Sequence, residues 1–208
     1  MKTIHEIKPI SIFETFLPVQ DNWMQYVLDS LYHQRTYEAD EEEDDGIFSS
    51  NKFVLNDLPN LKFLILQEFE LYIRDYFKIK KCISFDFINS WINFHPPQHS
   101  CHLHNHCNSI FSGVYYLSND KNMGDITFHT DPFDNNIAKG FEFEFDEWTD
   151  SNCYSYKISP KSGTLIIFPS YLKHSVSKNM ADVNRFSLAF NLFFKNSKWG
   201  KEHNQIEI

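Results

Sequence analysis

The stretch ISFDFINSWINF, residues 83–94, marks the point at which the character of the chain changes. From here on, aromatic and β-branched residues gather in short runs, and turn-forming segments such as Pro160-Lys161-Ser162-Gly163 separate the runs. The pattern predicts strands at 83–94, 110–117, 125–128, 141–145 (a strict alternation, FEFEF), 154–158, 164–168 and 185–194. Many short strands without helices between them indicate a β-sandwich or a closed barrel.

The chain before residue 83 has a helical pattern instead. Apolar residues recur at helical spacing from Leu61 to Phe77, after a capping side chain at Asn56-Asp57 and with Pro59 in the first turn. A second helix is predicted over 21–32. We therefore expect a mainly β protein with N-terminal helices packed outside the sheets. It would be a single domain over 1–208, in which 1–80 is a mostly helical support region and 82–195 is the core.

Composition narrows the class of protein. Hydrophobic residues make up 42% and charged residues 23% of the 208 residues, which is the balance of a globular protein and excludes a disordered chain. Seven acids between Glu38 and Asp45 account for most of the net charge of −9, and we interpret this run as a solvated loop. An acidic chain without a basic stripe is a poor partner for duplex nucleic acid.

The cellular location is predicted from three features that the sequence does not show: a membrane-spanning run, a signal peptide and a disulfide scaffold. Its longest apolar runs are too short to span a membrane, and the charged N-terminus does not resemble a signal peptide. Four cysteines in a chain of this length do not form a disulfide scaffold. These features predict a cytoplasmic protein without a membrane partner.

The segment HSCHLHNHC, residues 99–107, is the densest source of metal-binding side chains. In an extended chain alternate residues share a face, so His102, His104 and His106 can point the same way and two of them can bind one metal ion. A structural zinc site built from Cys101, Cys107 and two histidines is an alternative. Such sites usually draw their ligands from spaced pairs such as CxxC, which this segment lacks.

Two further candidates lie in the last third of the chain. The run GTLIIFPSYLKHSV, residues 163–176, is a buried strand followed by a loop that carries His174, and Arg185-Phe186-Ser187 begins the last long strand. Iron(II) that activates oxygen needs three protein ligands on one face and open positions for a co-substrate and O₂. A dicarboxylate co-substrate also needs a fixed cation, which an arginine beside a hydroxyl group supplies.

Five segments together resemble the iron(II)- and 2-oxoglutarate-dependent oxygenase superfamily: SWINFHPP (90–97), HNHCNSIFSGVYYL (104–117), DITFHTDPF (125–133), GTLIIFPSYLKHSV (163–176) and NRFSLAFN (184–191). Within it they most resemble a branch common in marine bacteria and phages that carries HxH-x-x-S-x-x-SGxYY. The resemblance covers about residues 82–195, and it implies a double-stranded β-helix, or jelly roll.

The resemblance also implies cofactors and residue roles. Iron(II) would be bound by His104 and His174, and the distal carboxylate of 2-oxoglutarate by Arg185. Ser187 and Tyr116 would be neighbours of that carboxylate, and Asn93 and Asn191 are weaker candidates for polar contacts in the same cavity. Zinc or nickel can take the place of iron in purified protein.

One position departs from the family pattern. Most members have His-x-Asp or His-x-Glu, whereas His106 occupies the acid position here. Either iron is bound by His104, His106 and His174, or a carboxylate from Asp131 or Asp125 joins the ligands. A shift of register to His102 and His104 is a third alternative.

The leading functional hypothesis is a dioxygenase that decarboxylates 2-oxoglutarate to succinate and hydroxylates a substrate with O₂. A prolyl or other residue of a protein or peptide is the substrate class that the resemblance implies, although the sequence does not identify the substrate itself. Residues 132–148 and 38–45 are candidates for the substrate loops. The rival hypothesis is a three-histidine, cupin-like metalloprotein. A catalytically silent binding module and a thiol nucleophile at Cys101 or Cys107 are weaker alternatives.

Overall fold

The computed structural model describes residues 10–31, 47–118, 121–130, 144–149 and 153–195, and two short strands at 198–199 and 206–207. The helical elements are α1 (Asp21–Leu31), α2 (Val54–Asp57), α3 (Pro59–Leu71) and the π-helical turn η1 (Tyr72–Tyr76). The strands are β1 (Phe13–Phe16), β2 (Ile47–Phe48), β3 (Ser84–His95), β4 (Cys101–His104), β5 (Phe111–Ser118), β6 (Ile126–His129), β7 (Ser155–Ile158), β8 (Thr164–Pro169), β9 (His174–Val176), β10 (Arg185–Lys195), β11 (Lys198–Trp199) and β12 (Ile206–Glu207).

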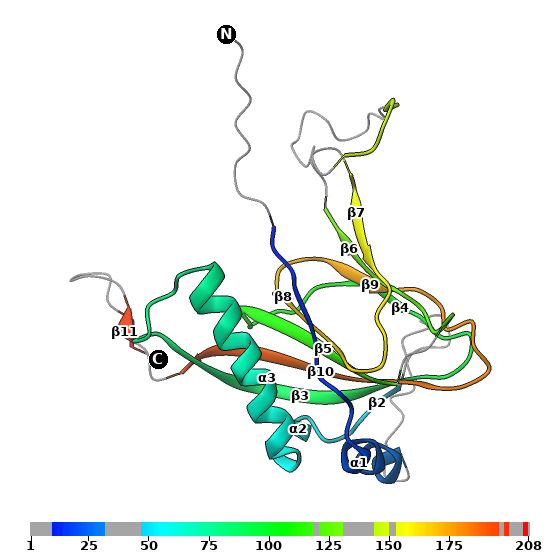
Figure 1. Ribbon diagram of the computed structural model, residues 1–208, viewed down its shortest axis with the longest axis horizontal. Coiled ribbons are helices and arrows are strands. Elements are labelled where there is room, and N and C mark those ends of the chain that lie inside the picture. Colours follow the sequence, from blue (N-terminus) through cyan, green and yellow to red (C-terminus); the bar gives the residue numbers. More distant parts are fainter. Residues whose placement is uncertain are drawn as a thin grey trace.

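Two antiparallel sheets form the body of the protein (Figure 1). The larger sheet has the order β1-β8-β5-β10-β3-β2, and the smaller one has the order β4-β9-β6-β7. β11 and β12 pair only with each other. Helix α3 lies across the face of the larger sheet that is turned away from the smaller one (Figure 1). The prediction of a jelly roll with helices packed outside is confirmed.

Strand β10 shows how the sequence builds the two sides of the larger sheet. Phe186, Leu188 and Phe190 belong to the hydrophobic core beneath the helices. The alternate residues Arg185, Ser187 and Ala189 line a cavity on the opposite side. Because successive side chains of a strand point to opposite faces, one segment supplies both the core and the cavity wall.

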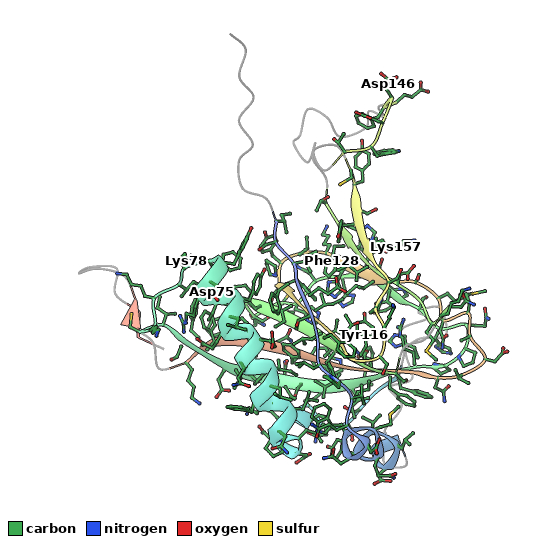
Figure 2. All side chains as sticks on the ribbon, in the orientation of Figure 1. Asp75, Lys78, Tyr116, Phe128, Asp146 and Lys157 are labelled. Carbon is green, nitrogen blue, oxygen red and sulfur yellow. The ribbon has the colours of Figure 1, made fainter. Side chains whose placement is uncertain are left out.

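The core beneath the helices contains the apolar stripe of α3. Leu61, Ile65 and Phe69 are fully buried there, as the helical spacing predicts. A second core, which includes Tyr116 and Phe128, lies between the sheets, and both residues are labelled in Figure 2. The region between the two sheets is therefore apolar except where the cavity residues interrupt it.

The start of α3 corrects one prediction. Its N-cap is Leu58, and no side chain caps the helix. Asp57 ends α2 instead, and its carboxylate accepts hydrogen bonds from the Tyr26 hydroxyl at 2.7 Å and from Asn51 Nδ2 at 2.8 Å. The acidic side chain is thus used to join α1 to the β2–α2 connection.

Most predicted strands are present, with four differences, one of which is that β11 and β12 were not predicted. Residues 144 and 145 are not in a strand, and 141–143 lie outside the described residues. β1 and β2 come from the region predicted to be helical and pair with β8 and β3. β4 and β9 are short, polar strands that were not predicted. The acidic run at 38–45 and residues 132–143 of the predicted substrate loop also lie outside the described residues.

No helix among the described residues is both long and apolar enough to cross a membrane.

Candidate metal centre and adjoining cavity

Three histidines converge at one end of the smaller sheet. His104 is the last residue of β4 and His174 the first residue of β9, and the two are direct partners in the antiparallel β4–β9 ladder. His106 follows two residues after β4, where its backbone N–H donates to Ser170 O at 3.0 Å. One nitrogen from each of these histidines lies within 4.8 Å of the others. Such a set of donors can hold a metal ion.

Backbone carbonyls orient two of the rings. His104 Nδ1 lies 2.8 Å from His102 O, and His174 Nδ1 lies 3.1 Å from Leu172 O. Because a carbonyl oxygen only accepts, Nδ1 carries the proton in both rings and Nε2 is left with a free lone pair. A hydrogen bond of this kind is the usual way in which proteins fix the orientation of a metal-binding histidine.

The environment keeps His106 and His174 neutral. Burial, assisted by the neighbouring His104, lowers the pKa of His174 to about 3 and that of His106 to about 4. Metal binding requires the neutral imidazole, so no proton has to be displaced from either ring at neutral pH. Two aromatic rings form apolar walls beside the histidines. The ring centroid of Phe168 lies 4.7 Å from that of His174, and the ring centroid of Trp91 lies 5.8 Å from that of His106.

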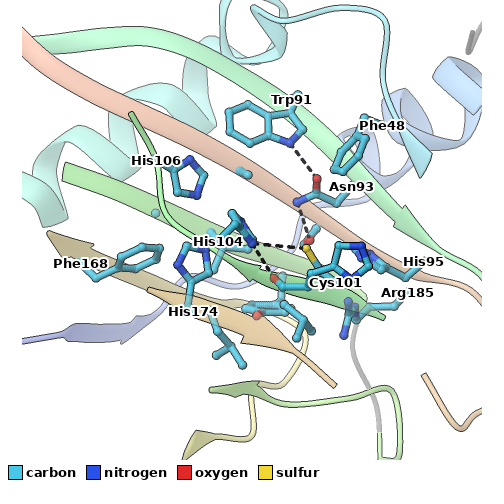
Figure 3. A pocket seen from close by; sticks show the side chains of 18 of the residues that line it. Phe48, Trp91, Asn93, His95, Cys101, His104, His106, Phe168, His174 and Arg185 are labelled. Carbon is cyan, nitrogen blue, oxygen red and sulfur yellow. Dashed lines mark hydrogen bonds between the residues drawn. The ribbon is translucent and has the colours of Figure 1, made fainter. Parts of the chain in front are cut away.

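A cavity of about 470 Å³ between the two sheets opens beside the three histidines (Figure 3). Four of the residues predicted to contact a co-substrate line it: Arg185, Ser187, Tyr116 and Asn93. Ser187 occupies the middle of this group, because it is the register partner of Asn93 in β3 and of Tyr116 in β5. Burial raises the pKa of Tyr116 to about 12, so its hydroxyl remains a hydrogen-bond donor.

Asn191 is placed elsewhere. It is not among the residues that line the cavity. Its Oδ1 accepts from Ser112 Oγ at 2.7 Å, and its Nδ2 donates to Asn89 Oδ1 at 2.8 Å. Ser112 Oγ also lies 2.7 Å from Ser170 Oγ. The side chain therefore belongs to a buried polar network.

Arg185 is the only cation that lies fully buried among the described residues, with 1% of its surface exposed. Its Nη1 donates to Met123 O at 2.8 Å, and its Nε has no hydrogen-bond partner in the described part of the chain. Burial lowers the pKa of the guanidinium. A buried cation with an unused donor is costly unless a ligand pairs with it. The site therefore fits a carboxylate, which guanidinium groups bind well.

The alternative ligands from the sequence are not part of the converging set of donors, although Cys101 Sγ lies 3.7 Å from His104 Nδ1. Asp125 Oδ2 is 3.7 Å from Lys157 Nζ and is not part of the converging donor set. Cys101 and Cys107 are not part of it either, and His102 takes part only through its backbone carbonyl, which accepts from His104 Nδ1. Asp131 lies outside the described residues.

Several cavity residues were missed by the sequence analysis. His95 and Trp91 line the cavity from β3, and Phe48 and Lys52 line it from β2 and the segment after it. Trp91, Asn93 and His95 are spaced by two residues, so the strand alternation around Asn93 could have identified the other two. Nothing in the sequence links Phe48 and Lys52 to this strand, because their positions depend on the β2–β3 pairing.

A protein family described as "Putative 2OG-Fe(II) oxygenase" matches residues 89–191 of the chain. This segment contains the three histidines, Arg185 and most of the cavity wall. No curated protein matches the chain significantly in sequence.

Solved structures resemble the fold at low sequence identity. The 2-oxoglutarate-dependent epimerase SnoN from nogalamycin biosynthesis has a TM-score of 0.63 and 10% identity, with coverage of 91% of this chain and 81% of that one. A Pseudomonas putida prolyl-4-hydroxylase has a TM-score of 0.55 and 16% identity, with coverage of 89% and 92%. HygX from Streptomyces hygroscopicus, solved with nickel, 2-oxoglutarate and hygromycin B, has a TM-score of 0.56 and 10% identity, with coverage of 88% and 82%.

Proposed function

Because the chain belongs, through residues 89–191, to the iron(II)- and 2-oxoglutarate-dependent oxygenase superfamily, we propose that it hydroxylates an unactivated C–H bond of an organic substrate. In this proposal His104, His106 and His174 hold the iron, and Arg185 holds the far carboxylate of 2-oxoglutarate. One observation carries the assignment: a buried arginine with an unpaired Nε lines the same cavity as three converging histidines.

The chain's own residues would prepare the centre for its ligands. Hydrogen bonds to His102 O and Leu172 O hold the rings of His104 and His174 with Nε2 unprotonated. With iron and 2-oxoglutarate bound, the chemistry supplied is the decarboxylation of 2-oxoglutarate to succinate and CO₂, coupled to transfer of an oxygen atom from O₂ to the substrate. A site without a carboxylate ligand carries one more positive charge than the usual two-histidine, one-carboxylate set, which alters its redox properties.

The opposite end of the cavity would bind the co-substrate's far end. The Arg185 guanidinium supplies the charge, and the hydroxyl groups of Ser187 and Tyr116 lie on the neighbouring positions of the sheet. Asn93 supports this group, since it accepts from Trp91 Nε1 at 2.8 Å and its Nδ2 lies 3.4 Å from Ser187 Oγ. Apolar residues of the second core exclude water from the space between the sheets.

The substrate would enter over the wall formed by Phe48, Lys52 and Trp91, because Trp91 lies against His106. Proline-containing peptides are the first substrates to test, since a prolyl residue is the substrate class implied by the sequence resemblance. Each hydroxylation would add about 16 mass units to the peptide. About one hydroxylation is expected for each succinate formed.

An anaerobic visible titration tests the cofactor assignment. We expect a weak charge-transfer band when both Fe(II) and 2-oxoglutarate are present, and no band with either one alone. His174→Ala and Arg185→Ala should each abolish it. Arg74→Gln is the matched control, because Arg74 pairs with Glu70 on the α3–η1 surface and does not line the cavity.

The opposite result is equally informative. If the protein binds iron but 2-oxoglutarate leaves the spectrum unchanged, the assignment of Arg185 to the co-substrate is wrong. The three histidines would then support a cupin-like metal site instead.

A further inference from the structure

His95 is a second buried polar residue at the Arg185 end of the cavity. It is the last residue of β3, and it is the direct partner of Arg185 in the β3–β10 ladder. Only 2% of its surface is exposed, and both residues line the cavity. Figure 3 shows the two side chains close together, on the side of Cys101 away from His106.

Neither ring nitrogen of His95 has a hydrogen-bond partner in the described part of the chain. The same is true of Arg185 Nε. Two neighbouring residues therefore hold three buried polar atoms without partners. A buried polar atom without a partner destabilises the folded protein, so this arrangement is expected where a ligand completes the hydrogen bonds.

The chemistry of His95 indicates what the ligand must offer. Burial lowers the pKa of His95 well below its ordinary value, and the positive charge of Arg185 and the nearby His99 act in the same direction. The neutral ring has one N–H donor and one lone pair. A carboxylate can accept both from this N–H and from Arg185 Nε–H, whereas a cation would be repelled by the guanidinium.

We propose that His95 and Arg185 together bind one carboxylate of a dicarboxylate ligand, with His95 donating a neutral ring N–H beside the guanidinium of Arg185. This inference rests on the proposed function, because it takes 2-oxoglutarate as the ligand in the cavity. It makes His95 a binding residue for the co-substrate, in addition to the predicted Arg185, Ser187 and Tyr116. It also predicts that the site selects 2-oxo acids by their far carboxylate.

The test compares two ligands on each variant. Anaerobic, Fe(II)-loaded protein is titrated with 2-oxoglutarate and with 2-oxopentanoate, which has the same chain length but a methyl group in place of the far carboxylate. His95→Phe should weaken binding of 2-oxoglutarate roughly ten- to hundredfold, the range for a hydrogen bond to a charged group. Binding of 2-oxopentanoate should change by less than about twofold, because that ligand offers nothing to His95.

Conservative variants separate binding from packing. His95→Gln and His95→Asn each retain a side-chain N–H, which lies about as far from the backbone as Nε2 in the first variant and Nδ1 in the second. At least one of them should recover most of the 2-oxoglutarate affinity that His95→Phe loses. Iron affinity, measured in the same samples without a 2-oxo acid, should be unchanged in all three variants. In zinc-loaded, ¹⁵N-histidine-labelled protein, the His95 ring resonances should shift on addition of 2-oxoglutarate and stay in place on addition of 2-oxopentanoate.

The outcomes distinguish this inference from the proposed function. If the unmodified protein does not bind 2-oxoglutarate, the proposed function fails and this inference fails with it. If the unmodified protein binds it and Arg185→Ala does not, but His95→Phe binds as well as the unmodified protein, only the role of His95 is overturned. Equal weakening of both ligands by His95→Phe would also overturn it, because such a loss reflects altered packing.

Discussion

His104 and His174 face each other as direct partners across the β4–β9 ladder, with ring centroids 4.3 Å apart. Each donates its Nδ1–H to the carbonyl oxygen two residues earlier in the chain, at His102 and at Leu172. The same backbone hydrogen bond thus orients both rings, and it leaves both Nε2 atoms available to bind a metal ion. His106 completes the set from the segment that follows β4. The positions of two donors are fixed by sheet pairing, and the third depends on a loop.

We expect the two sheet-borne histidines to be essential for metal binding. His104→Ala or His174→Ala should lower iron(II) affinity by at least roughly 100-fold, since loss of even an outer-shell partner costs ten- to hundredfold. Anaerobic calorimetry with Fe(II), checked by the metal content after desalting, measures this. Retention of full affinity by either variant would show that the donors do not act as a set.

The position of His106 can be tested by a change to the family's usual residue. His106→Asp should still bind iron(II), because a carboxylate at this position restores the two-histidine, one-carboxylate set, whereas His106→Ala should bind it more weakly. Asp125→Asn should bind it like the unmodified protein, since Asp125 pairs with Lys157 outside the donor set. Loss of iron from Asp125→Asn would instead identify that carboxylate as a ligand.

Gly113 is needed for packing beneath the cavity. A Cβ atom there would overlap the ring of Phe190 and lie 2.8 Å from Ile166 O, a backbone atom that cannot move away easily. Gly113→Ala should therefore destabilise the protein by about 1–3 kcal/mol. In the double variant Gly113→Ala/Phe190→Leu, the loss of stability measured by urea unfolding should be smaller than the sum of the losses in the two single variants. Unchanged stability of Gly113→Ala would contradict this packing.

Replacing Asn191 should lower the stability of the protein and leave the binding of 2-oxoglutarate unchanged. Asn191→Ala removes the partner of both Ser112 and Asn89 in a buried network, which should cost about 1–3 kcal/mol. Its affinity for 2-oxoglutarate, measured by the anaerobic titration, should match that of the unmodified protein. A selective loss of 2-oxoglutarate binding without a loss of stability would place Asn191 in the binding site after all.

The buried His95 also predicts a pH dependence of folding. Its pKa is lowered in the folded state, so below about pH 6.5 the unfolded chain binds this proton and the folded chain does not. The neutral His95 ring therefore has no effect on the pH dependence of the free energy of unfolding above that pH. Below it, the free energy of unfolding decreases as the pH falls, by at most about 1.4 kcal/mol per pH unit. Urea unfolding of the metal-free protein at pH 7, 6 and 5 measures this dependence.

His95→Phe is the comparison for this measurement, because it keeps a buried ring and removes the titrating group. The unmodified protein should lose more stability on acidification than His95→Phe does. Contributions from the other histidines cancel in the difference. Parallel pH profiles for the two proteins would mean that His95 does not remain neutral in the folded state.

Local patterns predicted the elements that carry their own signal. Helix α3 buries one periodic face, and every second residue of β10 from Phe186 to Leu192 is apolar and lies in the core, so this spacing was sufficient to locate both elements. The cap of α3 was predicted wrongly, because Asp57 instead accepts hydrogen bonds from Tyr26 on α1, 31 residues away, and from Asn51 between β2 and α2. β4 and β9 were not predicted, since their few residues become strands only through pairing, of β4 with β9 and of β9 with β6.

The sequence by itself determined the jelly-roll class, the identity of His104, His106 and His174 as candidate ligands, and the presence of Arg185 at the start of the last long strand. Strand spacing predicted a sandwich or a closed barrel, and the family resemblance of five segments implied the jelly roll and the roles of these residues. Only the tertiary structure decided which side chains meet. The β4–β9 register brings His174 opposite His104, the β3–β10 register brings His95 opposite Arg185, and Asn191 is held in a network away from the cavity. Register between strands tens of residues apart depends on the packing of the whole sheet, so no local pattern could specify it.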